Sequence, residues 1–102
     1  MNERAYERID VSVNAHICCE PYRYQSTITN MSEKGVCIHT AMCFPIETKC
    51  NLFISGKDEW LEEQAFVKHI TKIEGYHDSM GLELVNPSRQ YREFVNTLEG
   101  AS

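Results

Sequence analysis

Two arginines near the N-terminus, Arg4 and Arg8, are well suited to grip an anionic ligand. They are four positions apart, and this spacing puts both side chains on one face whether the segment is a helix or a strand. An arginine guanidinium presents paired N–H donors that match phosphate oxygens and the O6 and N7 atoms of guanine, and its plane stacks on bases. The pair therefore indicates a two-arginine clamp for phosphate or guanine.

A short polar segment further along, Asn30-Met-Ser32-Glu-Lys-Gly35, is the second feature with binding chemistry. If the chain is extended there, Asn30 and Ser32 point to the same side. Gly35 is free to take a positive φ, so it permits a sharp turn before the apolar residues that follow. Combined with the arginine pair, this segment predicts a site for a guanine nucleotide.

Each of these residues also has an ordinary structural interpretation. Arg4 and Arg8 have Glu3 and Glu7 as neighbours, so they could simply be solvated arginines in surface ion pairs. Exposed ion pairs of this kind contribute little to stability. The polar segment resembles the Asx and Ser/Thr turns in which a side chain caps the backbone locally. Taken one at a time, the residues leave both interpretations open.

Alternating apolar and polar residues predict a mainly β fold. The clearest alternation is at 11–18, where Val11, Val13, Ala15 and Ile17 share one face. Further strands are expected at 24–29, 36–40, 50–54, about 64–73 and around 80–84. The start of the fifth segment is ambiguous, because residues 61–65 favour a helix by propensity.

A single helix is expected near residues 87–99, after the strands. Asn86 is a candidate N-cap, Pro87 suits the first turn, and Gly100 is a natural stop. Apolar residues recur at helical spacing on one face, namely Tyr91, Phe94, Val95 and Leu98. Closing the strands into a small barrel would remove the sheet edges, and the helix would cover one side. We therefore expect residues 1–9 to form an arm and residues 10–102 a single barrel domain.

Composition narrows the functional classes. The net charge of −5 argues against DNA or RNA binding, which needs a broad basic face. No apolar run approaches the ~20 residues of a membrane span, and the polar N-terminus lacks the apolar core of a signal peptide. Five cysteines, an odd number without a secretory context, suggest reduced thiols in the cytoplasm.

The sequence contains no recognisable catalytic motif, so we expect neither enzyme activity nor a cofactor. A zinc site built from Cys37, His39, Cys43 and Cys50 is disfavoured, because their spacing matches no common pattern. The adjacent Glu62 and Glu63 are most simply a solvated face.

The ordered motifs Arg4-x-x-x-Arg8 and Asn30-x-Ser32-x-x-Gly35 resemble those of the PilZ domain family, which binds cyclic di-GMP. The segment Gly81-Leu-Glu-Leu84 is similar to the last core strand of that family. The resemblance implies a six-stranded antiparallel β-barrel with a C-terminal α-helix. It also implies that the arginines take guanine bases and phosphates, that Asn30 and Ser32 take a guanine edge and a phosphate, and that Gly35 allows close backbone approach.

One position departs from the fullest family pattern. Many members carry a third arginine directly before the pair, where this chain has Glu3. The exchange of a cation for an anion should weaken binding. The resemblance predicts a cytoplasmic cyclic di-GMP receptor that acts on a protein partner in motility, exopolysaccharide synthesis or pilus control. The alternative is a degenerate PilZ-like interaction module that binds no nucleotide.

Overall fold

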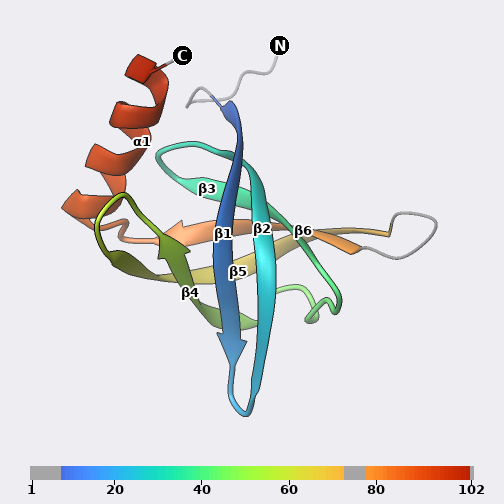
Figure 1. Cartoon of the computed structure of the whole chain (residues 1–102). Coiled ribbons are helices and arrows are strands. Elements are labelled where there is room, and N and C mark those ends of the chain that lie inside the picture. The colour runs from blue at the N-terminus through green and yellow to red at the C-terminus, as the bar shows by residue number, and fades with distance from the viewer. Residues whose placement is uncertain (1–7, 73–77, 102) are drawn as a thin grey trace.

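The structure, a computed structural model, describes residues 8–72 and 78–101 and consists mostly of β-strands. The six strands are β1 (Ile9–Cys19), β2 (Tyr22–Met31), β3 (Gly35–Thr40), β4 (Lys49–Ser55), β5 (Trp60–Lys72) and β6 (Asp78–Val85), and α1 (Arg89–Ala101) follows them. They form a closed barrel in the order β1-β2-β3-β6-β5-β4, with every neighbouring pair antiparallel (Figure 1). This confirms the predicted six-stranded antiparallel barrel with a C-terminal helix.

The barrel interior is built by the period-two pattern seen in the sequence. In β5 the inward positions Leu61, Glu63, Ala65 and Val67 are buried, while the alternate residues between them are exposed or half-buried. The segment 61–65, which favours a helix by propensity, is a strand because it pairs with β4 from Trp60 onward. Pairing with β4, joined by pairing with β6 from Gln64 onward, outweighs the small intrinsic preference of single residues for a helix.

The helix starts later than the sequence suggested. Ser88, rather than Asn86, is the N-cap, since its hydroxyl accepts a hydrogen bond of 3.0 Å from the backbone N–H of Tyr91. Asn86 instead takes a positive φ of 52° in the connection from β6. The helix also extends to Ala101, so Gly100 does not end it.

A buried carboxylate fixes the start of the helix. Glu63 is 4% exposed and accepts hydrogen bonds from the backbone N–H of Ser88, at 3.0 Å, and from its hydroxyl. The expectation that Glu62 and Glu63 form a solvated pair is therefore correct for Glu62 and wrong for Glu63. Glu63 lies at an inward position of β5, and its charge is stabilised by the donors at the helix N-terminus.

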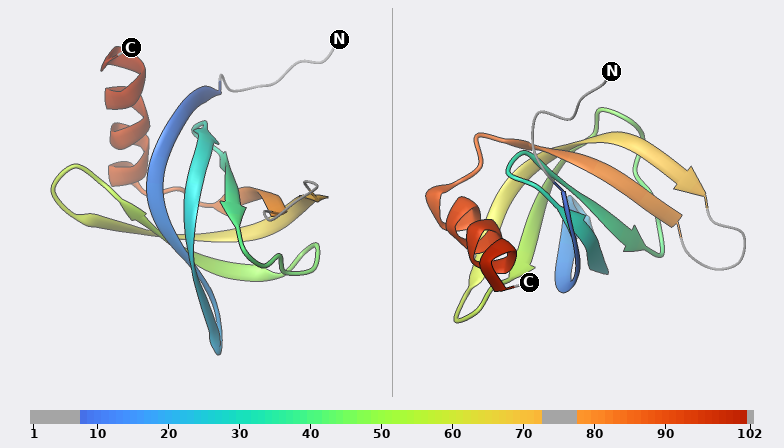
Figure 2. Two further views of the ribbon diagram at one scale, coloured as in Figure 1. Left: turned by 45° about the vertical axis from the view of Figure 1, so that its right-hand side comes forward. Right: turned by 90° about the horizontal axis from the view of Figure 1, so that it is seen from above.

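The helix inserts Tyr91 and Val95 into the core, where both are almost completely buried. It stands at the end of the barrel where β1 starts and where the β2–β3 connection lies (Figure 2). This position brings α1 against the segment that carries Ser32 and Gly35. In the described part of the chain, no helix is long and apolar enough to cross a membrane.

Candidate functional site

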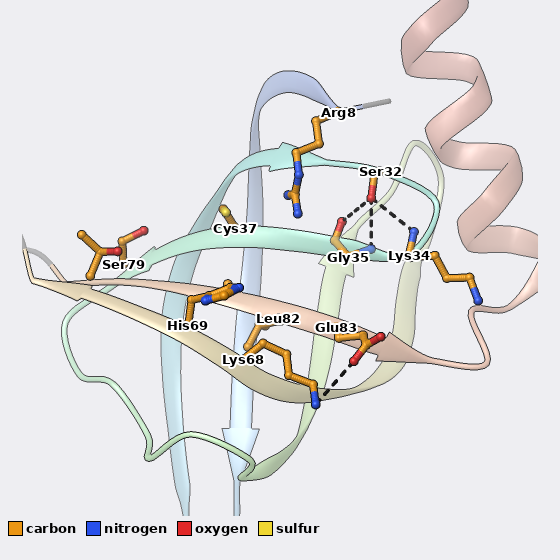
Figure 3. Close-up of a pocket in the computed structure, with 12 residues that line it drawn as sticks. Arg8, Ser32, Lys34, Gly35, Cys37, Lys68, His69, Ser79, Leu82 and Glu83 are labelled. Carbon is orange, nitrogen blue, oxygen red and sulfur yellow. Dashed lines mark hydrogen bonds and ion pairs between the residues drawn. The ribbon is translucent and has the colours of Figure 1, made fainter. Parts of the chain in front are cut away.

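A cavity of about 640 Å³ lies on the outer face of β3, β6 and β5, next to the β2–β3 connection (Figure 3). Arg8, Ser32 and Gly35, three of the five site residues predicted from the sequence, line it. Asn30 contacts Arg8 rather than the cavity itself. Arg4, the fifth residue, lies outside the described residues, as does most of the predicted arm.

The two sequence motifs meet through one hydrogen bond. Arg8 Nη1 donates to Asn30 Oδ1 over 2.9 Å, across 22 positions of the chain. Arg8 directly precedes β1, and Asn30 lies near the end of β2, where the β1–β2 ladder pairs it with Asp10. The amide of Asn30 thus restrains the guanidinium, which points toward the cavity in Figure 3. A restrained arginine loses less conformational freedom when it binds an anion.

Ser32 shapes the β2–β3 connection. Its hydroxyl oxygen accepts hydrogen bonds from the backbone N–H groups of Lys34, at 3.3 Å, and Gly35, at 3.2 Å. Its own backbone N–H donates to the Gly35 carbonyl at 2.9 Å. The side chain is buried, so the turn-capping interpretation of Ser32 is correct in this structure. Ser32 also lines the cavity.

Gly35 is required by close packing and not by a positive φ, contrary to the sequence-based expectation. It is the first residue of β3 and pairs with Glu83 of β6. A Cβ atom at this position would lie 2.6 Å from the carbonyl oxygen of Leu82. The missing side chain therefore lets β3 approach β6 closely at the motif.

The phenol of Tyr91 supports this connection from inside. Its hydroxyl donates to the Ser32 carbonyl over 2.6 Å and lies 3.4 Å from the Gly35 carbonyl. Burial raises the pKa of Tyr91 well above its usual value, and the nearby Glu63 carboxylate raises it further. The phenol is therefore a permanent donor at ordinary pH. This contact has no signature in the sequence, because the partners are 59 positions apart.

Three further charged residues line the cavity: Lys34, Lys68 and Glu83. Lys68 Nζ lies 3.0 Å from a carboxylate oxygen of Glu47 and 3.5 Å from one of Glu83. The hydrogen bond to Glu47 is the main reason that the pKa of Lys68 is raised, so the ammonium stays charged. Together with Arg8, the described residues that line the cavity include three cationic side chains and one carboxylate, although the whole chain is acidic.

No metal centre is evident at the cysteines and histidine considered from the sequence. None of the five cysteines, all of which lie in the described part of the chain, forms a disulfide, and Cys50 is buried in the core. Within residues 8–72 and 78–101, no three His, Cys, Asp or Glu side chains are grouped in a way that would hold a metal ion.

The family model described as the PilZ domain matches residues 2–99. The chain belongs to the PilZ domain family. A search of curated protein sequences found no match for this PilZ domain.

Three solved structures share the fold. The Bacillus subtilis inhibitor of motility (MotI/DgrA) is 18% identical with a TM-score of 0.78, over 100% of this chain and 54% of that one. Escherichia coli YcgR in complex with c-di-GMP is 15% identical with a TM-score of 0.79, over 96% and 46%. The PilZ domain of YcgR with c-di-GMP is 14% identical with a TM-score of 0.75, over 98% and 95%. This PilZ domain thus spans about half of the first two proteins.

Proposed function

We propose that this PilZ domain is a receptor for cyclic di-GMP. The observation that carries the proposal is the hydrogen bond between Arg8 and Asn30, which joins the two sequence motifs at the edge of one cavity. Membership of the PilZ family and the two structural neighbours solved with c-di-GMP support the choice of ligand.

The charge distribution of the cavity suits this ligand. Cyclic di-GMP carries two phosphate charges, and Arg8, Lys34 and Lys68 place three cations along the cavity wall. These attractions act in a partly exposed cavity, so added salt will weaken them. The net charge of the whole chain matters less, because screening limits interactions beyond about 10 Å at 0.1 M salt.

Each motif residue has a distinct proposed role. Arg8 and Arg4 contact guanine and phosphate, and Asn30 orients Arg8 and accepts or donates at a guanine edge. Ser32 holds the connection in shape and offers its hydroxyl to a phosphate. Gly35 gives the ligand access to the backbone of β3.

The proposed activity is binding and signalling, without catalysis. In this account the domain acts in the cytoplasm, and ligand binding creates a surface for a protein partner. Motility, exopolysaccharide and pilus systems are the candidate classes of partner. One structural neighbour is itself described as an inhibitor of motility.

A second candidate is an interaction module that keeps the barrel and binds no nucleotide. Glu3, at the position where many relatives carry an additional arginine, favours it. A nucleotide titration distinguishes the two candidates.

Isothermal titration of the whole chain with cyclic di-GMP and, separately, cyclic di-AMP tests the proposal. We expect saturable binding of cyclic di-GMP that weakens as salt rises from 50 to 300 mM. Adenine lacks the O6 acceptor that arginine contacts, so cyclic di-AMP should bind much more weakly. Equal affinity for the two dinucleotides, or binding of neither by folded protein, would reject the proposal.

A further inference from the structure

A β-bulge places two consecutive side chains of β5 on the same outer face. The β5–β6 register shifts between Val67 and His69, so Lys68 has no partner of its own in the ladder. Val67 is fully buried, whereas both Lys68 and His69 line the cavity. Neighbouring residues of a regular strand point to opposite faces, and a bulge changes the direction of one of them.

The bulge lies opposite a glycine that leaves room for the His69 ring. Gly81 of β6 pairs with His69 on one side and with Cys37 of β3 on the other. A Cβ atom on Gly81 would lie 3.3 Å from Cδ2 of His69, so the ring lies over the position where a side chain would be. Figure 3 shows the imidazole on β5, directed across the cavity floor.

Glu83 stands next to this floor and close to the motifs. It pairs with Gly35 across β3 and β6, and it projects outward because Leu82 and Leu84 on either side are buried. Lys68 Nζ lies 3.5 Å from Oε1 of Glu83. The remaining oxygen lone pairs of this carboxylate are accessible, since the side chain is 58% exposed.

We propose that Glu83 of β6 and His69 of β5 form a guanine subsite on the β6 and β5 side of the cavity. The Glu83 carboxylate accepts hydrogen bonds from N1–H and from the N2 amino group of guanine, and the His69 ring stacks on the base. This inference rests on the proposed function, and it assigns the second base of the ligand to residues outside both motifs.

The chemistry of the carboxylate explains the choice of base. An ionised carboxylate only accepts hydrogen bonds, and guanine presents two adjacent donors on its Watson–Crick edge. Adenine presents an acceptor, N1, in the place of one of these donors, so its lone pair would face the carboxylate. With adenine, the carboxylate would lack a hydrogen-bond donor, and this loss makes such a site strongly selective for guanine. The Lys68 ammonium offsets the negative charge of Glu83. The repulsion between Glu83 and the two phosphates of the ligand is therefore reduced.

Two dinucleotides that differ by one group on each base test the subsite. Cyclic di-IMP keeps N1–H, O6 and N7 but lacks the N2 amino group, so the ratio of its Kd to that of cyclic di-GMP measures recognition of that group. The variants are Glu83→Ala and the matched control Glu47→Ala. Both remove a carboxylate that contacts Lys68, but Glu47 does not line the cavity.

We expect the wild-type chain and Glu47→Ala to prefer cyclic di-GMP over cyclic di-IMP at least tenfold, and Glu83→Ala to reduce that ratio about tenfold. Removal of a nearby negative charge will affect both dinucleotides equally, so it cancels in the ratio. An unchanged ratio in Glu83→Ala would reject the subsite while leaving the receptor function intact. Absence of cyclic di-GMP binding to wild-type protein would reject the receptor function, and the subsite with it.

Replacement of His69 tests the stacking part separately. His69→Ala should weaken binding of both dinucleotides to a similar extent, because stacking does not depend on the N2 amino group. His69→Phe restores an aromatic face and should recover most of the affinity. An affinity in His69→Ala equal to that of wild type would show that no base lies against this ring.

Discussion

The buried hydroxyl of Tyr91 donates a hydrogen bond of 2.6 Å to the carbonyl oxygen of Ser32. This contact joins α1 to the connection that carries the second binding motif. The same hydroxyl lies 3.4 Å from the Gly35 carbonyl, so a single phenol holds both ends of the Ser32–Gly35 turn. The helix is consequently a structural support for the candidate site.

Tyr91→Phe removes this support with little change in volume. The buried Ser32 carbonyl loses a donor, so stability should fall by about 1–3 kcal/mol and cyclic di-GMP affinity should fall several-fold. Thermal melting and titration measure the two effects. Ser88→Ala is the control, because it removes the helix cap and the hydroxyl donor to Glu63, at a cost of about 1–3 kcal/mol, without touching Ser32. Equal losses of affinity in both variants would show that Tyr91 acts only through global stability.

Gly35→Ala should damage both the fold and the site. Its Cβ atom would lie 2.6 Å from the Leu82 carbonyl oxygen, and overpacking of this kind costs about 1–3 kcal/mol. Gly56→Ala is a matched control, since its Cβ atom would lie 2.7 Å from the Glu59 carbonyl oxygen, away from the cavity. We expect similar falls in melting temperature and a loss of ligand affinity in Gly35→Ala alone. Normal binding by folded Gly35→Ala would contradict the assigned role.

Replacement of Glu63 should destabilise the fold much more than replacement of the adjacent Glu62. Glu63→Ala leaves the Ser88 N–H and hydroxyl without their acceptor, so we expect a loss of about 1–3 kcal/mol in the free energy of unfolding. Glu62→Ala changes an exposed side chain and should stay within about 0.5 kcal/mol of wild type. Chemical denaturation measures both. Equal effects would mean that Glu63 is not an anchor for the helix.

Stability should fall at alkaline pH because of Cys50. Burial, reinforced by the neighbouring Cys19 and Cys18, raises the pKa of the Cys50 thiol from 9.0 to about 12. The unfolded chain releases this proton first, so the contribution is complete below pH 9 and is lost as pH rises toward 12. Between pH 8 and pH 10 we expect a loss of about 1 kcal/mol. Cys50→Ala should show a flatter pH profile, and an unchanged slope would exclude this thiol as the cause.

The barrel was predictable because alternation specifies which face of each strand is buried. In β1 the face that points into the barrel is indicated by Ala15 and Ile17. In β6 it is indicated by Met80, Leu82 and Leu84. The start of β5 could not be predicted in this way, because residues 61–65 favour a helix by propensity. They form a strand because they pair with β4. Glu63 alternates with Leu61, Ala65 and Val67 on the face of β5 that points into the barrel. Its burial could therefore have been predicted if the segment had been assigned as a strand and not as a possible helix.

The candidate site was predictable only where the sequence carries a motif. Arg8, Asn30, Ser32 and Gly35 do come together, although the reason for Gly35 is the approach of β6 and not the turn. Glu83 and Lys68 reach the cavity through strand pairing and a bulge, and neither depends on local sequence. Tyr91 was expected on the apolar face of the helix, but its partner was set by the three-dimensional packing of α1.

The central claim is that Arg8 holds cyclic di-GMP in the cavity where the two motifs meet, and titration of the Arg8→Ala variant tests it most directly. The matched control is Arg23→Ala, an exposed arginine on β2 whose guanidinium lies over Phe53 and does not line the cavity. Loss of the charge-assisted contacts of Arg8 should weaken binding about tenfold to a few hundredfold. We expect wild type and Arg23→Ala to bind alike and Arg8→Ala to bind more weakly by that factor, with an unchanged melting temperature. Equal affinity in all three proteins, or no binding by folded wild type, would contradict the claim.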